Sequence, residues 1–278
     1  MFGLDASQQF LDQYGVHIDL YRHLLIGGLI FARIFIMILF IPYLGARPIP
    51  GRIRVAITIS LVLFFYAPVE AMAEGTLPTS GAVIVSLFLK EVLFAIILGF
   101  AAGLVFYGIQ AAGNMIDNQR QLANAQIFNP AIGSQASLFG IFYYQLSIVI
   151  FLIIGGHRLF IQALGRSFEA VPVLKFPEIT AGMTPLIDLL LRLGGDILVI
   201  AIQLGAPVII SIFMSDIILG LTNRVAPMVN VFEMGFNIKG FLGVLMVYLS
   251  IPLIVFQMKI WFLEYMESVR GIIEIFIR

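Results

Sequence analysis

The sequence contains no cysteine, and few of its residues carry a charge. The absence of cysteine excludes disulfides, thiolate nucleophiles and cysteine-ligated metal sites. Only 12% of the 278 residues are Asp, Glu, Lys or Arg, about half the share that is typical of soluble domains. The 16 basic residues balance the 16 acidic ones, so bulk electrostatics gives no reason to expect nucleic acid as a partner.

Apolar residues dominate instead, at 60% of the chain with a mean hydropathy of +1.04. The apolar runs are longer and more uniformly apolar than the alternating strands of a membrane barrel. Residues 1–20 are polar, with three Asp and no Lys or Arg, and they lack the pattern of a cleavable signal peptide. We therefore expect an all-α integral membrane protein that inserts through its own spans.

Six stretches meet or approach the roughly 20 apolar residues that a membrane-spanning helix needs. They are Leu24–Ala46, Ile53–Ala73, Ala82–Gly113, Leu138–Leu164, Leu186–Leu221 and Phe241–Phe262. The fifth stretch is too long for one perpendicular crossing and is expected to bend at Gly205-Ala206-Pro207, because Pro207 removes a backbone donor. The spans predict about six to eight long helices or helical hairpins.

The chain is predicted to form a single membrane domain, 1–278. Its predicted order is a polar N-terminus (1–20), a first helical group (24–113), a polar loop (114–137), a second helical group (138–221), a polar hinge (222–240), and a C-terminal helix with an amphipathic tail (241–278).

The loop 114–137 is unusually rich in amide side chains: Asn114, Asn118, Gln119, Gln121, Asn124, Gln126, Asn129 and Gln135. Amides both donate and accept hydrogen bonds, which suits a segment that must satisfy its backbone inside a protein-lined cavity. An ordinary solvated connector is the alternative interpretation.

Five charged residues stand inside apolar spans: Arg33, Lys90, Glu91, Asp196 and Asp216. Each is costly in hydrocarbon, so each is expected to face protein or water. Inter-helix or inter-subunit ion pairs that fix the register are favoured over a proton or ion relay. Lys90 and Glu91 are adjacent and point about 100° apart on a helix, so pairing with other helices is expected rather than pairing with each other. A pair between Asp216 and Arg224 is also expected.

Small residues at Gly99 and Gly103 have the spacing that lets two helices approach closely in lipid. Packing within the chain is the favoured interpretation, and contact with a partner subunit is the other. No nucleotide-binding, zinc-protease or serine-hydrolase motif is present, so neither an enzyme nor a cofactor is predicted.

The chain resembles the T component of type III secretion export gates, a family that includes the flagellar export protein FliR. The resemblance covers nearly the full length and depends on the order of several motifs. They are Leu44-Gly45-Ala46-Arg47 with Pro50 and Arg52-Ile-Arg54, Asp117-Asn118-Gln119-Arg120, Asn129-Pro130 with Gly133-Ser134-Gln135, Gly155-Gly156-His157, and Asp216 to Asn230. The second and last motifs resemble the virulence-type (injectisome) branch more than the flagellar branch. Gln121 and Met228 depart from the pattern.

The resemblance implies a subunit that completes a helical ring with R and S (FliP- and FliQ-like) subunits, close to the U (FlhB-like) switch protein. The ring would form the inner-membrane pore for unfolded exported proteins and would be lifted largely out of the bilayer. The loop would plug the closed pore through Asn114, Asp117, Asn118, Gln119, Arg120, Asn129, Pro130, Gly133 and Gln135. Inter-subunit or structural polar residues would be Arg47, Arg52, Arg54, Lys90, Glu91, Asp216, Asn223, Arg224, Pro227 and Asn230.

The positions of the basic residues agree with an arrangement in which not every apolar span crosses the membrane. Arg47, Arg52 and Arg54 fall on one side of a plain six-span arrangement, whereas Arg158, Arg166 and Lys175 fall on the other, against the preference for basic cytoplasmic loops. A miscounted helix would explain this equally well. A small-solute secondary transporter is the competing class, supported by Pro207 and the intramembrane acids.

Overall fold

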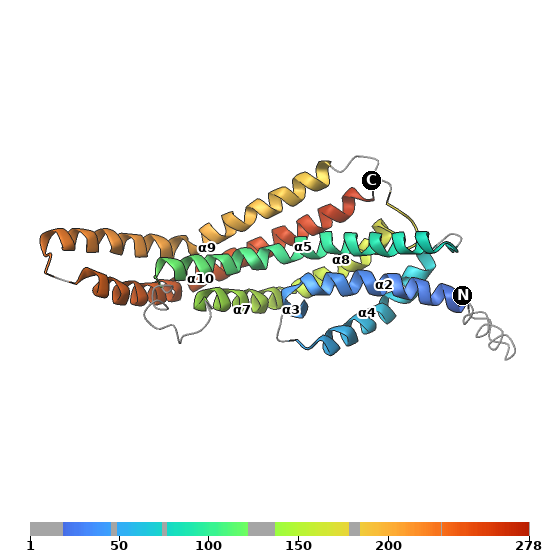
Figure 1. Ribbon diagram of the computed structural model, residues 1–278, viewed down its shortest axis with the longest axis horizontal. Coiled ribbons are helices and arrows are strands. Elements are labelled where there is room, and N and C mark those ends of the chain that lie inside the picture. Colours follow the sequence, from blue (N-terminus) through green and yellow to red (C-terminus); the bar gives the residue numbers. More distant parts are fainter. Residues whose placement is uncertain are drawn as a thin grey trace. The chain divides into compact units, whose positions relative to one another are not determined.

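The computed structural model describes residues 19–45, 49–73, 77–121, 137–177, 184–228 and 230–277. Within these ranges all regular secondary structure is helical, in eight helices without a strand, so the predicted all-α fold is confirmed (Figure 1). The helices are α2 (Leu20–Phe40), α3 (Pro42–Gly45), α4 (Gly51–Met72), α5 (Gly81–Gln119), α7 (Leu138–Ile153), α8 (Gly156–Ala170), α9 (Thr184–Val225) and α10 (Val231–Ile275). Five helices are long and apolar enough to cross a membrane, or up to six spans if the bent pair α7 and α8 counts as one.

The first predicted span is a helix followed by a separate turn. Asp19 caps α2, since its side chain accepts a hydrogen bond from the Arg22 backbone N–H at 3.1 Å. The helix therefore begins four residues earlier than Leu24. It ends at Phe40, because Pro42 lacks the backbone donor that would continue it, and Pro42 instead opens the short helix α3.

The fourth predicted span, Leu138–Leu164, is wrong as a continuous helix. It breaks between α7 and α8 at Gly155, whose φ of +79° lies in the left-handed region that favours glycine. Glycine is also needed at position 156, because a Cβ there would lie 2.3 Å from a ring carbon of Phe151. The uninterrupted apolar run concealed this break.

The predicted polar loop and polar hinge are both shorter than expected. Helix α5 continues to Gln119, so residues 114–119 are helical, and only residues 226–230 separate α9 from α10. Polar residues are tolerated at these helix ends because their side chains find local or tertiary partners, which outweigh a modest loss of helix propensity. One example is Thr222, whose hydroxyl donates to the Ile218 carbonyl at 2.9 Å.

Helix α9 remains one helix through Pro207, and its ribbon changes direction partway along its length (Figure 1). With 42 residues it is about 63 Å long. As predicted, this helix is longer than one perpendicular crossing of a membrane requires.

The chain divides into two compact units. Unit 1 comprises residues 1–102, 160–186 and 269–278, and unit 2 comprises residues 103–159 and 187–268. In unit 1, α2 and α4 are joined where Arg22 donates to the Ala73 carbonyl at 3.1 Å. A Cβ at Gly99 would lie 3.0 Å from the Cβ of Phe40 on α2, so this glycine serves close packing within the chain, as the favoured interpretation expects.

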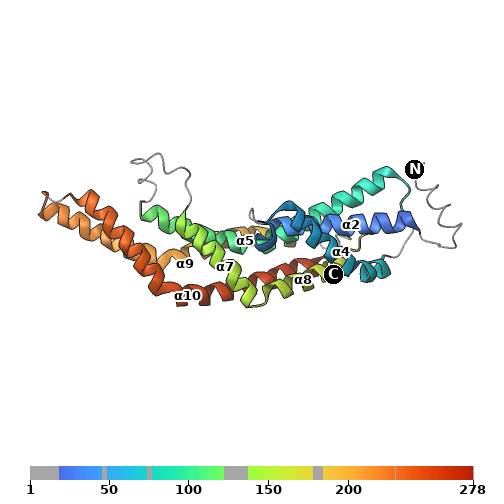
Figure 2. The ribbon, with the colours of Figure 1, turned by 90° about the horizontal axis from the view of Figure 1, so that it is seen from below.

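Unit 2 has an aromatic core in which Phe106, Phe151 and Phe262 contact one another, with centroid separations of 4.9 to 5.3 Å. The orange C-terminal part of α9 and the following part of α10 run side by side as an antiparallel hairpin in both views (Figures 1 and 2).

Several helices leave apolar surface outside the chain's own core. In the most apolar window of each helix, 67% of α5 is buried, but only 33% of α9, 28% of α10 and 17% of α4. Surfaces of this extent are unstable in water, so these helices require lipid or other polypeptide around them.

Candidate functional site: buried charge clusters

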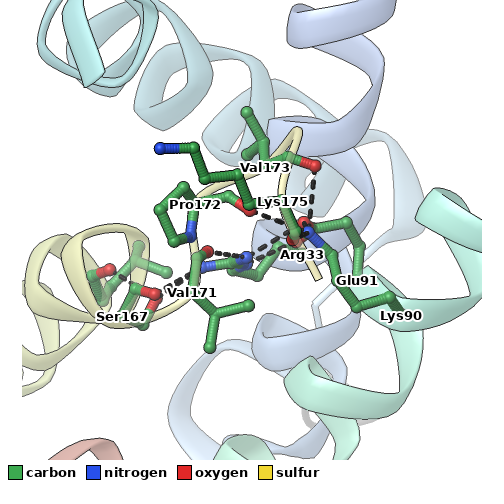
Figure 3. Close-up of polar contacts among 9 residues, drawn as sticks. Arg33, Lys90, Glu91, Ser167, Val171, Pro172, Val173 and Lys175 are labelled. Carbon is green, nitrogen blue, oxygen red and sulfur yellow. Dashed lines mark hydrogen bonds and ion pairs between the residues drawn. The ribbon is translucent and has the colours of Figure 1, made fainter. Parts of the chain in front are cut away.

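A fully buried ion pair joins two helices of unit 1 (Figure 3). The Arg33 guanidinium on α2 donates to both carboxylate oxygens of Glu91 on α5, with the Nη2–Oε1 distance at 2.9 Å. Both side chains are completely inaccessible to solvent. The Arg33 guanidinium also lies over the rings of Phe168 and Phe94, at 4.5 and 5.0 Å from their centroids. A bidentate pair of this kind fixes both the distance and the orientation of the two helices.

The same guanidinium holds the C-terminal end of α8. Arg33 donates to the backbone carbonyls of Ser167 and Val171, each at 2.6 Å. The last carbonyls of a helix lack intrahelical partners and carry the negative end of its dipole, so a buried cation stabilises them.

Lys90 extends the cluster to the segment after α8, residues 171–177, which we call the strap. Its ammonium donates to the carbonyls of Pro172, Val173 and Lys175 at 2.9 to 3.0 Å and contacts Glu91 at 2.8 Å (Figure 3). The expectation that Lys90 and Glu91 do not pair directly is therefore wrong. Their Cβ atoms diverge on the helix, but both side chains are long enough for their tips to converge.

A second cluster lies in unit 2, where α5 meets α7. The carboxylate of Asp117 accepts hydrogen bonds from the Ser137 hydroxyl at 2.7 Å, from the Phe139 backbone N–H at 2.8 Å and from Arg120 at 3.2 Å. Arg120 also lies over the Phe139 ring, 4.8 Å from its centroid. An acidic side chain at a helix N-terminus satisfies free backbone donors and opposes the helix dipole. We call Asp117, Arg120, Ser137 and Phe139 the clamp.

Replacing Asp117 by asparagine is expected to weaken the clamp by about 1–2 kcal/mol, because a neutral amide accepts more weakly than a carboxylate and has one acceptor oxygen instead of two. Faster hydrogen exchange at the Phe139 amide would report this change. Gln119→Ala is the matched control, since Gln119 lies two residues away on the exposed side of the same helix. Unchanged exchange in the Asp117 variant would contradict the assignment.

A third cluster joins the two helices of the α9–α10 hairpin. Asp216 forms an ion pair with Lys239, whose side chain is buried. The predicted pair between Asp216 and Arg224 is therefore wrong, because the hairpin brings Lys239 to Asp216 while Arg224 lies exposed near the end of α9. At the start of α10, the side chain of Asn230 accepts from the Glu233 backbone N–H and donates to the Glu233 carboxylate, both at 3.3 Å. This arrangement is a helix cap.

The other predicted site residues are dispersed. Arg54 donates to the Ile49 carbonyl at 3.0 and 3.2 Å, while Arg52, Asn223 and Pro227 are exposed. Asn118 and Gln119 lie on α5 and are exposed. Asn114 is also exposed, but its side-chain oxygen lies against Gly140 of α7, where a Cβ would be only 2.0 Å away. Five predicted residues lie outside the described ranges: Arg47, Asn129, Pro130, Gly133 and Gln135.

Sequence reasoning missed Lys239, Ser137 and the strap. The sequence could have indicated Lys239, since it is an isolated charge in an apolar run, as Asp216 is. No sequence pattern could have indicated the strap, because it contributes backbone carbonyls and not side chains.

This arrangement defines a class: a multi-pass helical membrane protein whose buried charges at Arg33, Lys90, Glu91 and Lys239 are paired within the chain and whose helices present broad apolar faces. Residues 24–265 match the family model described as bacterial export proteins, family 1. The chain belongs to this family, and it is a non-enzymatic membrane component of the type III or flagellar protein export gate.

Relatives from both kinds of export system are similar to the chain. Flagellar biosynthetic protein FliR of Pectobacterium carotovorum is 31% identical over 226 residues, which cover 81% of this chain and 83% of the relative. Yop proteins translocation protein T of Yersinia pestis is 31% identical over 220 residues, covering 78% and 82%. Surface presentation of antigens protein SpaR of Shigella flexneri is 27% identical over 269 residues, covering 94% and 95%. Equal identity to the first two relatives does not separate the branches.

Proposed function

We propose that the chain assembles with R and S (FliP- and FliQ-like) subunits, close to the U (FlhB-like) switch protein, into an inner-membrane pore for unfolded proteins. We further propose that it serves a virulence-type injectisome, on the strength of the Asp117-Asn118-Gln119-Arg120 run and the Asp216 to Asn230 motif. The observation that carries the assembly is the low burial of α4, α9 and α10 within the chain. Apolar faces that the chain itself does not cover are suited to neighbouring subunits and lipid.

The saturation of the buried charges supports a structural role for them and counts against a transporter. The five N–H donors of Arg33 face Glu91, the Ser167 and Val171 carbonyls and the Ser167 hydroxyl. The ammonium of Lys90 is surrounded by three carbonyls and the Glu91 carboxylate. A solute or proton pathway needs polar groups that are free to exchange partners. The Arg33 cluster offers almost none.

Copurification separates these two functions. The gate subunit is expected to be purified from membranes together with R and S subunits, and to be poorly behaved when it is produced alone. A stable isolated monomer that binds and carries a small solute would overturn the proposal in favour of a transporter.

Of the predicted plug loop 114–137, residues 114–119 belong to helix α5, so we propose that residues 122–136 form the plug. This segment lies outside the described residues, and support for the plug comes from the residues on either side of it. The clamp joins the end of α5 to the start of α7, so the described residues that flank the segment are held together. A passage wide enough for an unfolded chain would leak ions unless it is occluded. An amide-rich segment can occlude it without permanent bonds.

Deleting residues 122–129, with the clamp left in place, is expected to raise the ion conductance of membranes that contain the complete gate. A deletion of equal length in the polar N-terminus, residues 6–13, serves as the control. Conductance that does not change while the gate assembles normally would contradict the plug.

A further inference from the structure

The exposed side of helix α5 changes from apolar to polar along its length. Between residues 89 and 100, its large exposed side chains are all apolar: Leu89, Leu93, Ile96 and Phe100. Between residues 103 and 119, every exposed side chain is instead polar and uncharged: Tyr107, Asn114, Asn118 and Gln119. Because apolar surroundings offer no hydrogen-bonding partner, this change indicates a polar neighbour along the second half of the helix.

Four polar residues of this half form a continuous stripe. Tyr107, the half-buried Gln110, Asn114 and Asn118 are spaced three, four and four positions apart, which places them on one side of a helix. We call them the polar stripe. Its 11 helical steps measure about 16 Å, which is the length of roughly five residues of extended polypeptide. The stripe therefore suits an elongated ligand.

The hydrogen-bonding groups of the polar stripe are not used by the rest of the described chain. Within the described ranges, no hydrogen bond joins a side chain of the stripe to another residue. The stripe follows the junction of α5 with α7, since the Asn114 oxygen lies against Gly140. Further along, the phenol groups of Tyr107 and Tyr144 are close enough to interact electrostatically. Amide and hydroxyl donors and acceptors thus line one side of this junction and are available to a ligand.

The two charged residues at this end of α5 do not disturb the neutrality of the stripe. Asp117 and Arg120 pair with each other, and their side chains are only 5% and 11% exposed. Helix α10 covers Arg120 from another side, because a Cβ at Gly243 would collide with the arginine side chain. A neutral surface does not select for or against charged segments, whereas a surface of one charge would attract segments of the opposite sign.

We propose that the polar stripe contacts the backbone of the polypeptide in transit. This inference rests on the proposed pore and extends it to named residues. Every residue of an unfolded chain except proline carries a backbone N–H, and every residue carries a carbonyl. Amides can both donate to that backbone and accept from it, and each such bond is weak in net terms because it replaces a bond to water. The stripe therefore accepts any sequence without holding it.

A moving polypeptide is favoured over a helix of a neighbouring subunit as the occupant. A partner helix uses its own backbone groups internally, so it would need matching polar side chains at the spacing of the stripe. An extended backbone carries the required groups at every residue. Asn114 and Asn118 then act on the moving chain and not as part of the plug.

The absence of cysteine makes a direct test possible, since a single introduced cysteine is the only thiol of the chain. Tyr107→Cys, Asn114→Cys and Asn118→Cys are made in the full-length chain within the complete gate. Controls are Val149→Cys and Ile210→Cys, two exposed positions elsewhere in unit 2. The probe is a protein exported by the same apparatus, fused to a tightly folded domain that stalls it. It carries one cysteine, at any of three positions in its unfolded part.

Oxidation is expected to link all three stripe positions to the stalled protein severalfold more than either control, wherever its cysteine lies. Disulfide adducts with a cysteine-bearing R or S subunit, and none with the stalled protein, would overturn the inference and assign the stripe to a partner helix. Absence of adducts in a gate that stalls the protein would also overturn it. Copurification with R and S subunits is measured first, so a failure of the proposed pore is seen separately.

A substitution gives an independent measurement. Asn118→Leu keeps a side chain of similar size but removes its hydrogen bonds, and it is expected to slow export about fivefold, as the loss of one hydrogen bond implies. Acidic and basic exported proteins should be slowed alike. Asn118→Gln keeps the amide and should export faster than the leucine variant. Equal export by the two variants, in gates that assemble equally, would overturn the inference.

Discussion

Replacing Glu91 by glutamine is expected to destabilise the protein by about 3–5 kcal/mol, because it leaves buried charges without their counterion. Arg33 and Lys90 would then be two buried cations without a counter-charge, held by backbone carbonyls, a neutral amide and, for Arg33, two aromatic rings. A loss of this size is a large part of a typical domain stability. The measurements are the amount of the chain in membranes and the unfolding midpoint of the detergent-purified gate.

The matched control for this substitution is Glu274→Gln. Glu274 pairs with Arg270 one turn away, at 3.1 Å, and both side chains are about half exposed. An exposed pair of this kind contributes at most about 0.5 kcal/mol. Equal membrane levels and equal midpoints for the two variants would show that the buried cluster does not hold unit 1 together.

The Arg33 cluster illustrates what the sequence could and could not predict. Isolated charges in apolar runs identified Arg33, Lys90 and Glu91 as inter-helix pairing residues, because the cost of an unpaired charge is independent of fold. Their partners could not be derived in the same way. Arg33 and Glu91 are 58 positions apart, and the strap acts through carbonyls that every residue has.

The helix ends illustrate a second limit. Apolar runs located the helices of the described residues, since length and apolarity suffice for that purpose. They failed at Gly155, where a left-handed glycine interrupts a run without any change in hydropathy. They failed again at residues 114–119, where polar side chains suggested a loop. Tertiary contacts of Asp117 with α7 keep that segment helical.

Replacing Gly113 by alanine is the second substitution with a large expected effect, about 3 kcal/mol of destabilisation. An added Cβ would lie 2.3 Å from the backbone oxygen of Phe139 and 2.5 Å from the backbone nitrogen of Gly140. Backbone atoms at a helix start cannot rotate away as a side chain can, so α5 and α7 must separate. Separation would also lengthen the hydrogen bonds from Ser137 and Phe139 to Asp117.

Gly220→Ala on α9 is the control for this prediction, because a Cβ there would meet nothing within 4 Å. Alanine in an open helical position gains up to about 1 kcal/mol over glycine, so the two variants should shift the unfolding midpoint in opposite directions. The Gly113 variant should additionally lose protection from hydrogen exchange at the Phe139 amide, which an effect confined to α5 would not produce. If both variants raise the midpoint, the close approach of α5 and α7 is not required for stability, and the clamp alone must join the two helices.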